Sequence, residues 1–287
     1  CAEDDWETWK LLTDKLGATW SKPTEIVVVR DHLSLSAMTG LPYEAARTTG
    51  TVAVAKWGRV TMITPRASSH GYPYRDTLAH ELTHLAITQR SLDRAPLWLQ
   101  EGLAKNMETK WRAPGPFDDR PSPDLVARRG MDKKLDLPLD KLGPSIAMLP
   151  SADAAMVAYA EVTSFLAFLM RRSAPDVLPK LLVALRTQEV DDALQAVTGM
   201  RLTAWDKEWR GDLLHRKLEP EVQTVLSAAR DPFRLGELLL GRGHAKEALT
   251  QLDRLPKEAL EDPMIRTVRA RALEAAKSSS GAACWSS

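Results

Sequence analysis

The pattern of apolar and polar residues predicts that the chain begins with a helix followed by a small sheet. Residues 4–16 place apolar side chains at helical spacing, which is typical of an amphipathic helix. Residues 24–30 are rich in β-branched side chains and follow Pro23, so we expect a buried strand there. Residues 51–55 and 59–64 are two further runs of this kind, close together in the chain, and they predict a hairpin or two adjacent strands.

Helical periodicity dominates the chain after these strands. The apolar positions predict helices at residues 32–40, 76–88, 96–107, 151–172, 176–186, 190–198 and 202–218. Residues 111–150 are rich in proline and charge, with one or two helical turns expected near residues 124–129. Connections of this length form lids, cleft walls or disordered segments, and we favour a wall of a substrate cleft because the segment follows the helix predicted at residues 96–107. The pattern therefore predicts an α+β fold for residues 1–218, in which a small β-sheet precedes a mainly helical domain.

The chain changes character at residue 219, where short helices alternate with turns. Residues 231–241, 245–255 and 263–276 have helical patterns, and residues 243–252 resemble a tetratricopeptide (TPR) helix. Only about one and a half such repeats fit, fewer than a solenoid needs to be stable alone. We expect residues 219–287 to be a TPR-like helical appendage that caps the preceding domain, begins a longer array or binds a protein partner. Its tail is expected to be disordered from residue 278.

The charge balance and hydropathy argue against several classes of partner. The 287 residues include 39 basic and 38 acidic side chains, a formal net charge of +1. Binding to nucleic acid or to an anionic membrane would require a basic surface, so we expect no nucleic-acid partner. No apolar run is expected to span a bilayer, because residues 154–170 are interrupted by Glu161.

The two cysteines, Cys1 and Cys284, lie at opposite ends of the chain. One interpretation is that Cys1 is the acylated first residue of a mature bacterial lipoprotein, tethered to a membrane in the cell envelope and therefore extracytoplasmic. The alternatives are a domain excised from a longer chain, and a disulfide between the two cysteines.

Candidate chemistry is concentrated in the sequence His80-Glu81-Leu82-Thr83-His84. On a helix, His80 and His84 lie on one face, so both imidazoles can bind one metal ion. Glu81 is about 100° round the helix from His80, close enough to reach a metal-coordinated water without binding the metal itself. The alternative is two surface histidines beside an ordinary helical glutamate.

A second motif, P-L-W-L-Q-E-G-L-A at residues 96–104, lies on the next predicted helix. Glu101 is a candidate third ligand, because two histidines and a glutamate leave a fourth position of zinc open for water. The alternative is a solvated helix carboxylate. Gly102 costs about 1 kcal/mol relative to alanine inside a helix, and we expect the metal-binding helix to cross closely at this point.

Together, the H-E-L-T-H and W-L-Q-E-G-L-A motifs resemble those of the gluzincin metallopeptidases, specifically the bacterial peptidase MA-like domains. The resemblance implies a zincin-type catalytic domain with zinc (Zn2+) bound by His80, His84 and Glu101, and with Glu81 as the catalytic base. The chain departs from the thermolysin-type pattern four residues after the ligand glutamate. Lys105 stands there in place of an aspartate that braces a metal-binding histidine.

The sequence therefore predicts a zinc metalloendopeptidase with a peptide or protein substrate. Tyr159, in a spacing that resembles the helix following the metal site in peptidase MA-like domains, is a candidate donor to the oxyanion formed when water attacks a peptide carbonyl. Alternatively, its hydroxyl only lies at the rim of a helical core. Two other functions compete: a catalytically silent peptidase-like domain that acts as a binding scaffold, and a helical adaptor in which residues 219–287 are the functional part.

Overall fold

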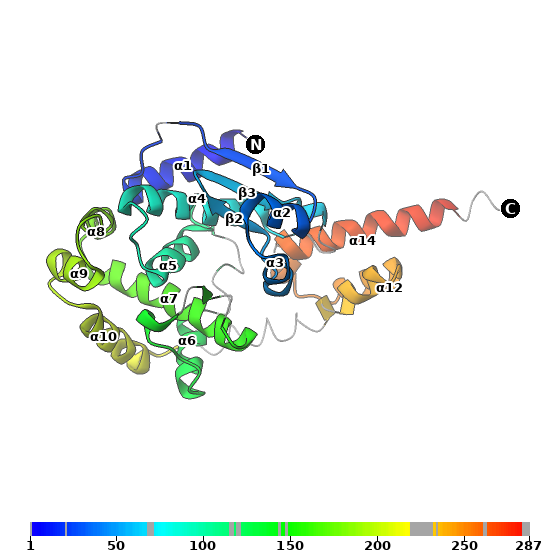
Figure 1. The fold of residues 1–287 in the computed structure, drawn as a ribbon. Helices are drawn as coiled ribbons and strands as arrows, with labels where there is room; N and C mark the ends of the chain where they lie inside the picture. The colour runs from blue at the N-terminus through cyan, green and yellow to red at the C-terminus, as the bar shows by residue number, and fades with distance from the viewer. Residues whose placement is uncertain are drawn as a thin grey trace. The chain divides into compact units, whose positions relative to one another are not determined.

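A computed structural model of the protein describes residues 2–20, 22–67, 72–114, 118, 122–142, 145–146, 149–218, 232–233, 235–260 and 263–282. The chain divides into two compact units. The first consists of residues 1–63, 75–113 and 122–218, and the second of residues 64–74, 114–121 and 219–287 (Figure 1). The sheet and the residues of both motifs belong to the first unit.

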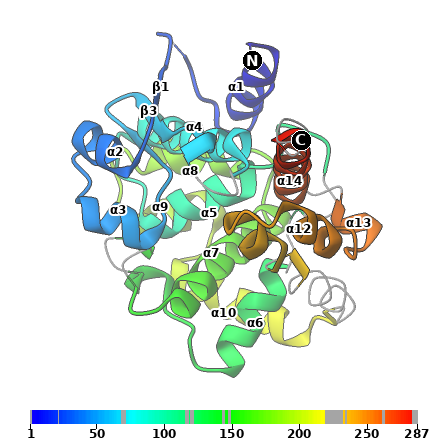
Figure 2. The ribbon, with the colours of Figure 1, turned by 90° about the vertical axis from the view of Figure 1, so that its right-hand side faces the viewer.

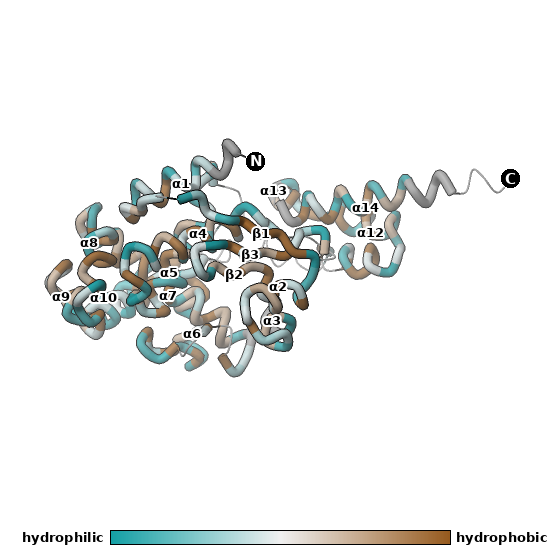
Figure 3. The backbone as a smooth tube through the Cα atoms, turned by 45° about the horizontal axis from the view of Figure 1, so that its top comes forward, coloured by the Kyte–Doolittle hydropathy of each residue, from teal (hydrophilic) through white to brown (hydrophobic). Residues whose placement is uncertain are grey.

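The sheet has three strands, β1 (Glu25–Val29), β2 (Ala53–Lys56) and β3 (Arg59–Ile63). Its order is β1-β3-β2, with β1 parallel and β2 antiparallel to β3. The predicted hairpin is therefore confirmed, and β2 is an edge strand. Val29 of β1 and Ile63 of β3 are buried in one cluster with Leu35, and Figure 3 shows the apolar character of β1 and β3 along the tube.

The turn between β2 and β3 holds an aromatic residue in an unfavourable backbone conformation. Trp57 and Gly58 have φ values of 55° and 75°, and they link the paired residues Lys56 and Arg59. Two-residue turns of this kind favour Asn-Gly, and a left-handed conformation costs a residue with a side chain about 1–2 kcal/mol. The Trp57 side chain is 67% exposed, so burial does not offset this cost.

The helices up to residue 218 are α1 (Ala2–Leu16), α2 (His32–Thr39), α3 (Tyr43–Thr49), α4 (Tyr74–Ser91), α5 (Leu97–Met107), α6 (Pro123–Asp132), α7 (Ala152–Arg172), α8 (Val177–Ala184), α9 (Val190–Thr198) and α10 (Leu202–His215), with short 3-10 turns at Pro65–Ala67 and Leu139–Lys141. This order confirms the predicted α+β fold, in which a small sheet precedes mainly helical structure.

Two of these helices differ from the prediction. The periodicity does not predict α3, whose seven residues include two threonines, poor helix formers, and which ends at Gly50 in a left-handed conformation. α6 is a complete helix of ten residues where only one or two turns are expected. It packs on α7, and Gly130 leaves room for Val157 of α7, which a Cβ would approach to 2.3 Å.

α7 is the central helix of the first unit and packs against both α5 and α6 (Figure 2). Its Phe165 ring lies edge-to-face with Trp98 of α5 and Trp209 of α10, at centroid distances of 5.4 and 5.8 Å. Contrary to the expectation from Glu161, residues Asp153–Arg172 are long and apolar enough to span a membrane by length and composition alone. However, 67% of the apolar window is buried within the protein, which is typical of a core helix in a globular domain.

Glu161 is accommodated in the interior by polar partners. Its side chain is fully buried; Oε2 accepts a hydrogen bond from the Leu137 N–H at 3.2 Å, and Oε1 lies 3.8 Å from Nη2 of Arg210. Burial raises the pKa of Glu161 to about 8, although the Leu137 N–H and Arg210 act in the opposite direction. The interruption in the apolar run is therefore a polar contact that joins α7 to α10.

α5 approaches α7 closely at Gly102. A Cβ on Gly102 would lie 2.4 Å from Cδ2 of Leu166 and 2.7 Å from the carbonyl oxygen of Val162. One turn later, Nδ2 of Asn106 donates to the carbonyls of Gly102 and Thr163 at 2.7 and 3.0 Å. The expectation that the metal-binding helix crosses at Gly102 is therefore wrong, because the neighbouring backbone belongs to α7.

The second unit contains helical residues 235–241 and the helices α12 (Ala245–Leu252), α13 (Lys257–Leu260) and α14 (Pro263–Ala282). Its apolar residues, among them Leu252 and Val268, form a separate buried cluster. The prediction of disorder from residue 278 is wrong as far as Ala282, because α14 continues to that residue. Cys1 and residues 283–287, which include Cys284, lie outside the described residues. The TPR-like character of this part of the chain stays a prediction.

Gly102→Ala is expected to destabilise the fold by about 1–3 kcal/mol, because the added methyl group overpacks the contact with α7. Gly211→Ala is the matched control, since Gly211 also lies inside a helix but has open space where its Cβ would be. That substitution should stabilise the protein by about 0.5–1 kcal/mol. Thermal unfolding of both variants measures the two effects, and equal changes would contradict the close packing assigned to Gly102.

Candidate metal centre

α4 presents the two predicted histidine ligands on one face. His80 and His84 are one helical turn apart, and their Nε2 atoms lie 3.2 Å from each other. On the remaining surface of the helix, Leu78, Leu82 and Ala86 are buried. The amphipathic pattern thus anchors α4 in the core and leaves both imidazoles at a partly accessible site.

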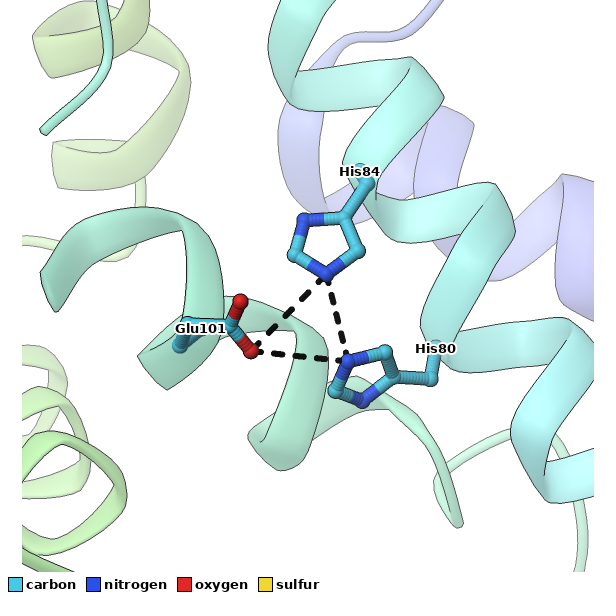
Figure 4. A group of neighbouring side chains, drawn as sticks. All are labelled: His80, His84 and Glu101. Atoms are coloured by element: carbon cyan, nitrogen blue, oxygen red, sulfur yellow. Dashed lines mark hydrogen bonds and ion pairs between the residues drawn. The ribbon is translucent and has the colours of Figure 1, made fainter. Parts of the chain in front are cut away.

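Glu101 of α5 completes the group. Its Oε2 atom lies 3.7 Å from Nε2 of His80 and 3.9 Å from Nε2 of His84, and all three side chains point toward one another (Figure 4). Within the described residues, these are the side chains whose ligand atoms, all within 4.8 Å of one another, could hold a metal ion. The structure therefore brings together the three residues predicted as ligands.

The donor set fits a zinc ion. Tetrahedral zinc, with nitrogen and oxygen ligands at about 2.0–2.1 Å, separates its ligand atoms by about 3.3 Å. The separations of 3.2, 3.7 and 3.9 Å found here lie close to that value. Two imidazoles and one carboxylate also leave a fourth position open, as in catalytic zinc sites.

Glu81, the predicted base, is buried next to His80. Its side chain accepts a hydrogen bond from the backbone N–H of Ala55 on β2. Burial raises the pKa of Glu81; the charge of His80 and the Ala55 N–H lower it, and the charge of Glu101 raises it further, so that the net shift is upward. A carboxylate with a raised pKa is better matched to accept and return a proton near neutral pH.

The two histidines have opposite pKa shifts. Burial alone would lower the pKa of His80, but hydrogen bonds to Glu101 and Glu108 and the charge of Glu81 raise it to about 9. Burial and the charge of His80 lower the pKa of His84 to about 4. In the metal-free protein near neutral pH, His84 is therefore neutral and His80 carries one additional proton, which a metal ion has to displace.

Glu108 is a residue of the site that the sequence analysis does not identify. It caps the C-terminus of α5, and its Oε2 lies 3.2 Å from Nδ1 of His80, the ring nitrogen that does not face His84. Its other oxygen accepts a hydrogen bond from Nζ of Lys105 at 2.6 Å. A carboxylate on the second nitrogen of a metal-binding histidine fixes the tautomer and the ring orientation.

The spacing of Glu108 explains how it takes the place of the missing aspartate. Glu101, Lys105 and Glu108 are separated by four and three residues, so they lie along one stripe of α5. The carboxylate that contacts the histidine lies seven residues after Glu101 instead of four, and Lys105, at the fourth position, neutralises its charge. The spacing of these three residues is visible in the sequence, but it does not show which of them contacts His80.

An ion pair links the beginning of α4 to the segment that follows α5. Arg112 binds both carboxylate oxygens of Asp76, at 3.0 and 2.7 Å. Nε1 of Trp111 lies within hydrogen-bonding distance of Asp76 Oδ1 and of the Glu108 carbonyl oxygen, at 3.0 and 3.1 Å. These contacts hold Glu108 in place relative to His80.

Tyr159 lies on α7 within electrostatic range of the candidate metal centre. Burial raises the pKa of its hydroxyl above the usual value, and the negative charges of Glu101, Glu81 and Glu108 raise it further. The hydroxyl therefore keeps its proton near neutral pH and is available as a hydrogen-bond donor.

In the metal-free protein, the contact between His80 and Glu108 is expected to stabilise the fold in a pH-dependent way. Hydrogen bonds to Glu101 and Glu108 raise the pKa of His80 from 6.5 to about 9, so the part of the stabilisation that Glu108 contributes is present at pH 6.5 and is lost as the pH rises through 9. The difference in free energy of unfolding between the parent protein and Glu108→Gln should therefore shrink by on the order of 1–2 kcal/mol across this range.

Denaturant unfolding in the presence of a chelator measures this difference. The pKa of Glu161, about 8, lies in the same range, but Glu161 is present in both proteins and its effect cancels. A difference that stays constant or grows as the pH rises would contradict the assignment of the His80 proton.

Comparison with known proteins identifies the family. No curated protein and no solved structure matches the chain. A family model described as the peptidase MA superfamily matches residues 7–215, a span that includes α4, α5 and α7 with His80, Glu81, His84, Glu101 and Tyr159. The resemblance inferred from the two motifs is thereby confirmed, and the chain belongs to the peptidase MA superfamily.

Proposed function

We propose that this member of the peptidase MA superfamily is a zinc-dependent endopeptidase. The observation that supports the proposal most directly is the convergence of donor atoms from His80, His84 and Glu101, beside a buried glutamate that is not part of the group. A zinc ion held by the three residues would lower the pKa of coordinated water toward neutrality and polarise the carbonyl of the scissile bond.

Glu81 acts as the general base in this proposal. Its carboxylate takes a proton from the attacking water as the water oxygen bonds to the carbonyl carbon, and it passes that proton to the leaving amine as the C–N bond breaks. The raised pKa of Glu81 makes its carboxylate a stronger base for the first of these transfers. The hydrogen bond from the Ala55 N–H holds the carboxylate in position.

Tyr159 acts as the donor to the developing oxyanion. As the carbonyl oxygen gains negative charge, a phenol hydroxyl that stays protonated stabilises it by a hydrogen bond. The upward pKa shift of Tyr159 keeps the proton on the hydroxyl throughout the reaction.

The edge strand β2 supports an extended peptide as the substrate. The N–H of Ile63 donates to the carbonyl of Val52 at 2.8 Å, and bonded pairs alternate with non-bonded pairs along an antiparallel ladder. Ala53 and Ala55 therefore direct their backbone groups toward the edge of the sheet that no other described strand covers, and the Ala55 N–H donates to Glu81 there. A peptide that adds a strand to this edge would run past the proposed base.

A catalytically silent scaffold is the competing function. A scaffold can use the same metal site and the same edge strand, but it has no use for a buried carboxylate of raised pKa next to a ligand. The position and environment of Glu81 therefore favour the enzyme.

Glu81→Gln is expected to retain about one zinc ion per chain and to lose at least roughly a hundredfold in kcat/KM for peptide hydrolysis, because glutamine keeps the shape of the side chain but does not take the proton. Glu101→Ala should lose the zinc itself. Elemental analysis of protein purified without a metal-affinity tag, together with hydrolysis of internally quenched peptides, measures both effects.

The outcomes separate the hypotheses. Bound zinc without hydrolysis of any peptide by the parent protein would favour the scaffold. An absence of bound zinc, even after zinc is added back, would contradict the metal site. Unchanged turnover in Glu81→Gln would remove Glu81 from the mechanism.

Tyr159→Phe is expected to lower kcat by about a hundredfold and to leave KM and zinc content unchanged. The reason is that the hydroxyl acts on charge that develops only in the transition state. Steady-state kinetics with zinc analysis tests this, and a variant that keeps its kcat would leave Tyr159 with a packing role alone.

A further inference from the structure

Trp57 lies at the end of the edge strand that passes Glu81. It follows Lys56, the last residue of β2, and lies two positions beyond Ala55, whose N–H meets the Glu81 carboxylate. With 67% of its surface exposed, the indole is available to a ligand that follows this edge.

Stability does not explain a tryptophan at this position. The residue has a φ of 55° in a turn position where asparagine is favoured, and the exposed ring adds little to the core. A residue held in a sparsely populated conformation, at a site where the surrounding fold gains nothing from it, is a reason to look for a function.

The indole is held in place by the residue before it. Nζ of Lys56 lies 4.5 Å from the centroid of the Trp57 ring, a cation–π contact, and the same Nζ donates to the carbonyl oxygen of Thr39 at 3.2 Å. The lysine thus connects the ring to the C-terminal end of α2. Orienting an exposed ring in this way lowers the entropy cost of binding an apolar group against it.

We propose that Trp57 forms an apolar subsite that selects peptides with an aromatic or large aliphatic side chain on the N-terminal side of the cleaved bond. The inference rests on the proposed peptidase function and adds a substrate preference to it. Antiparallel pairing is the more stable arrangement, and a peptide antiparallel to β2 has its N-terminal side toward Trp57. Because strands rise about 3.3 Å per residue, the preferred side chain lies about two residues from the bond.

Peptides with a C-terminal hydroxamate test the subsite, because the hydroxamate binds zinc and fixes the register of the peptide. A series of otherwise glycine–alanine peptides carries a single phenylalanine at each of the four positions before the hydroxamate. Their dissociation constants are measured by calorimetry with the zinc-loaded full chain. One phenylalanine position, about two residues from the hydroxamate, is expected to bind about tenfold more tightly than the peptide without phenylalanine.

Trp57→Asn is the informative variant, because asparagine suits the turn and the fold should be retained. It should abolish the gain from phenylalanine and leave the affinity for the phenylalanine-free peptide unchanged. Trp6→Ala is the matched control: Trp6, on α1, is 64% exposed, and its removal should leave the gain intact.

Each outcome bears on the proposal. A gain that persists in Trp57→Asn, or the absence of a gain at all four positions in the parent protein, would overturn the subsite and leave the metal centre standing. If the phenylalanine-free hydroxamate itself fails to bind, the proposed metal centre is wrong and the subsite inference falls with it.

Discussion

The close approach of α5 to α7 at Gly102 is the constraint on which the candidate metal centre depends. A side chain at this position would collide with the carbonyl of Val162, so only glycine permits the two backbones to approach this closely. This contact positions the adjacent Glu101 and, at the end of the same helix, Glu108. It also brings Tyr159 of α7 within range of their charges. A single packing contact thus determines where a candidate ligand, its neighbouring brace and a candidate oxyanion donor lie.

The centre is an electrostatically unbalanced group that a dication would neutralise. Glu81, Glu101 and Glu108 lie around two histidines, and their negative charge raises the pKa of His80 to about 9. Burial raises the pKa of Tyr159, and the same carboxylates raise it further. A zinc ion would supply the positive charge that the proton on His80 supplies in its absence. Burial and charge therefore favour metal binding and a protonated tyrosine together.

The main role of the sheet is to place strand β2 next to Glu81. β3 lies between β1 and β2, and this order leaves β2 with a free edge whose Ala55 N–H reaches Glu81. The same strand ends at Trp57, whose backbone conformation is unfavourable. The proposed base, the edge strand and the exposed indole thus occur on neighbouring elements, an arrangement suited to an extended chain that passes the candidate metal centre.

The apolar pattern of the sequence predicted the fold class, and the two motifs indicated the family and Glu101. Helix geometry placed His80 and His84 on one face, because residues four apart share a face. The sequence did not determine which backbone crosses Gly102, that β2 is the edge next to Glu81, or that Glu108 reaches His80. Each of these contacts is between residues of different helices or strands. It therefore depends on how each helix is rotated about its axis and how deeply it is packed into the core. The spacing of Glu101, Lys105 and Glu108 can be read from the sequence. Only the packing of α5 against α7 determines that Glu108 faces His80.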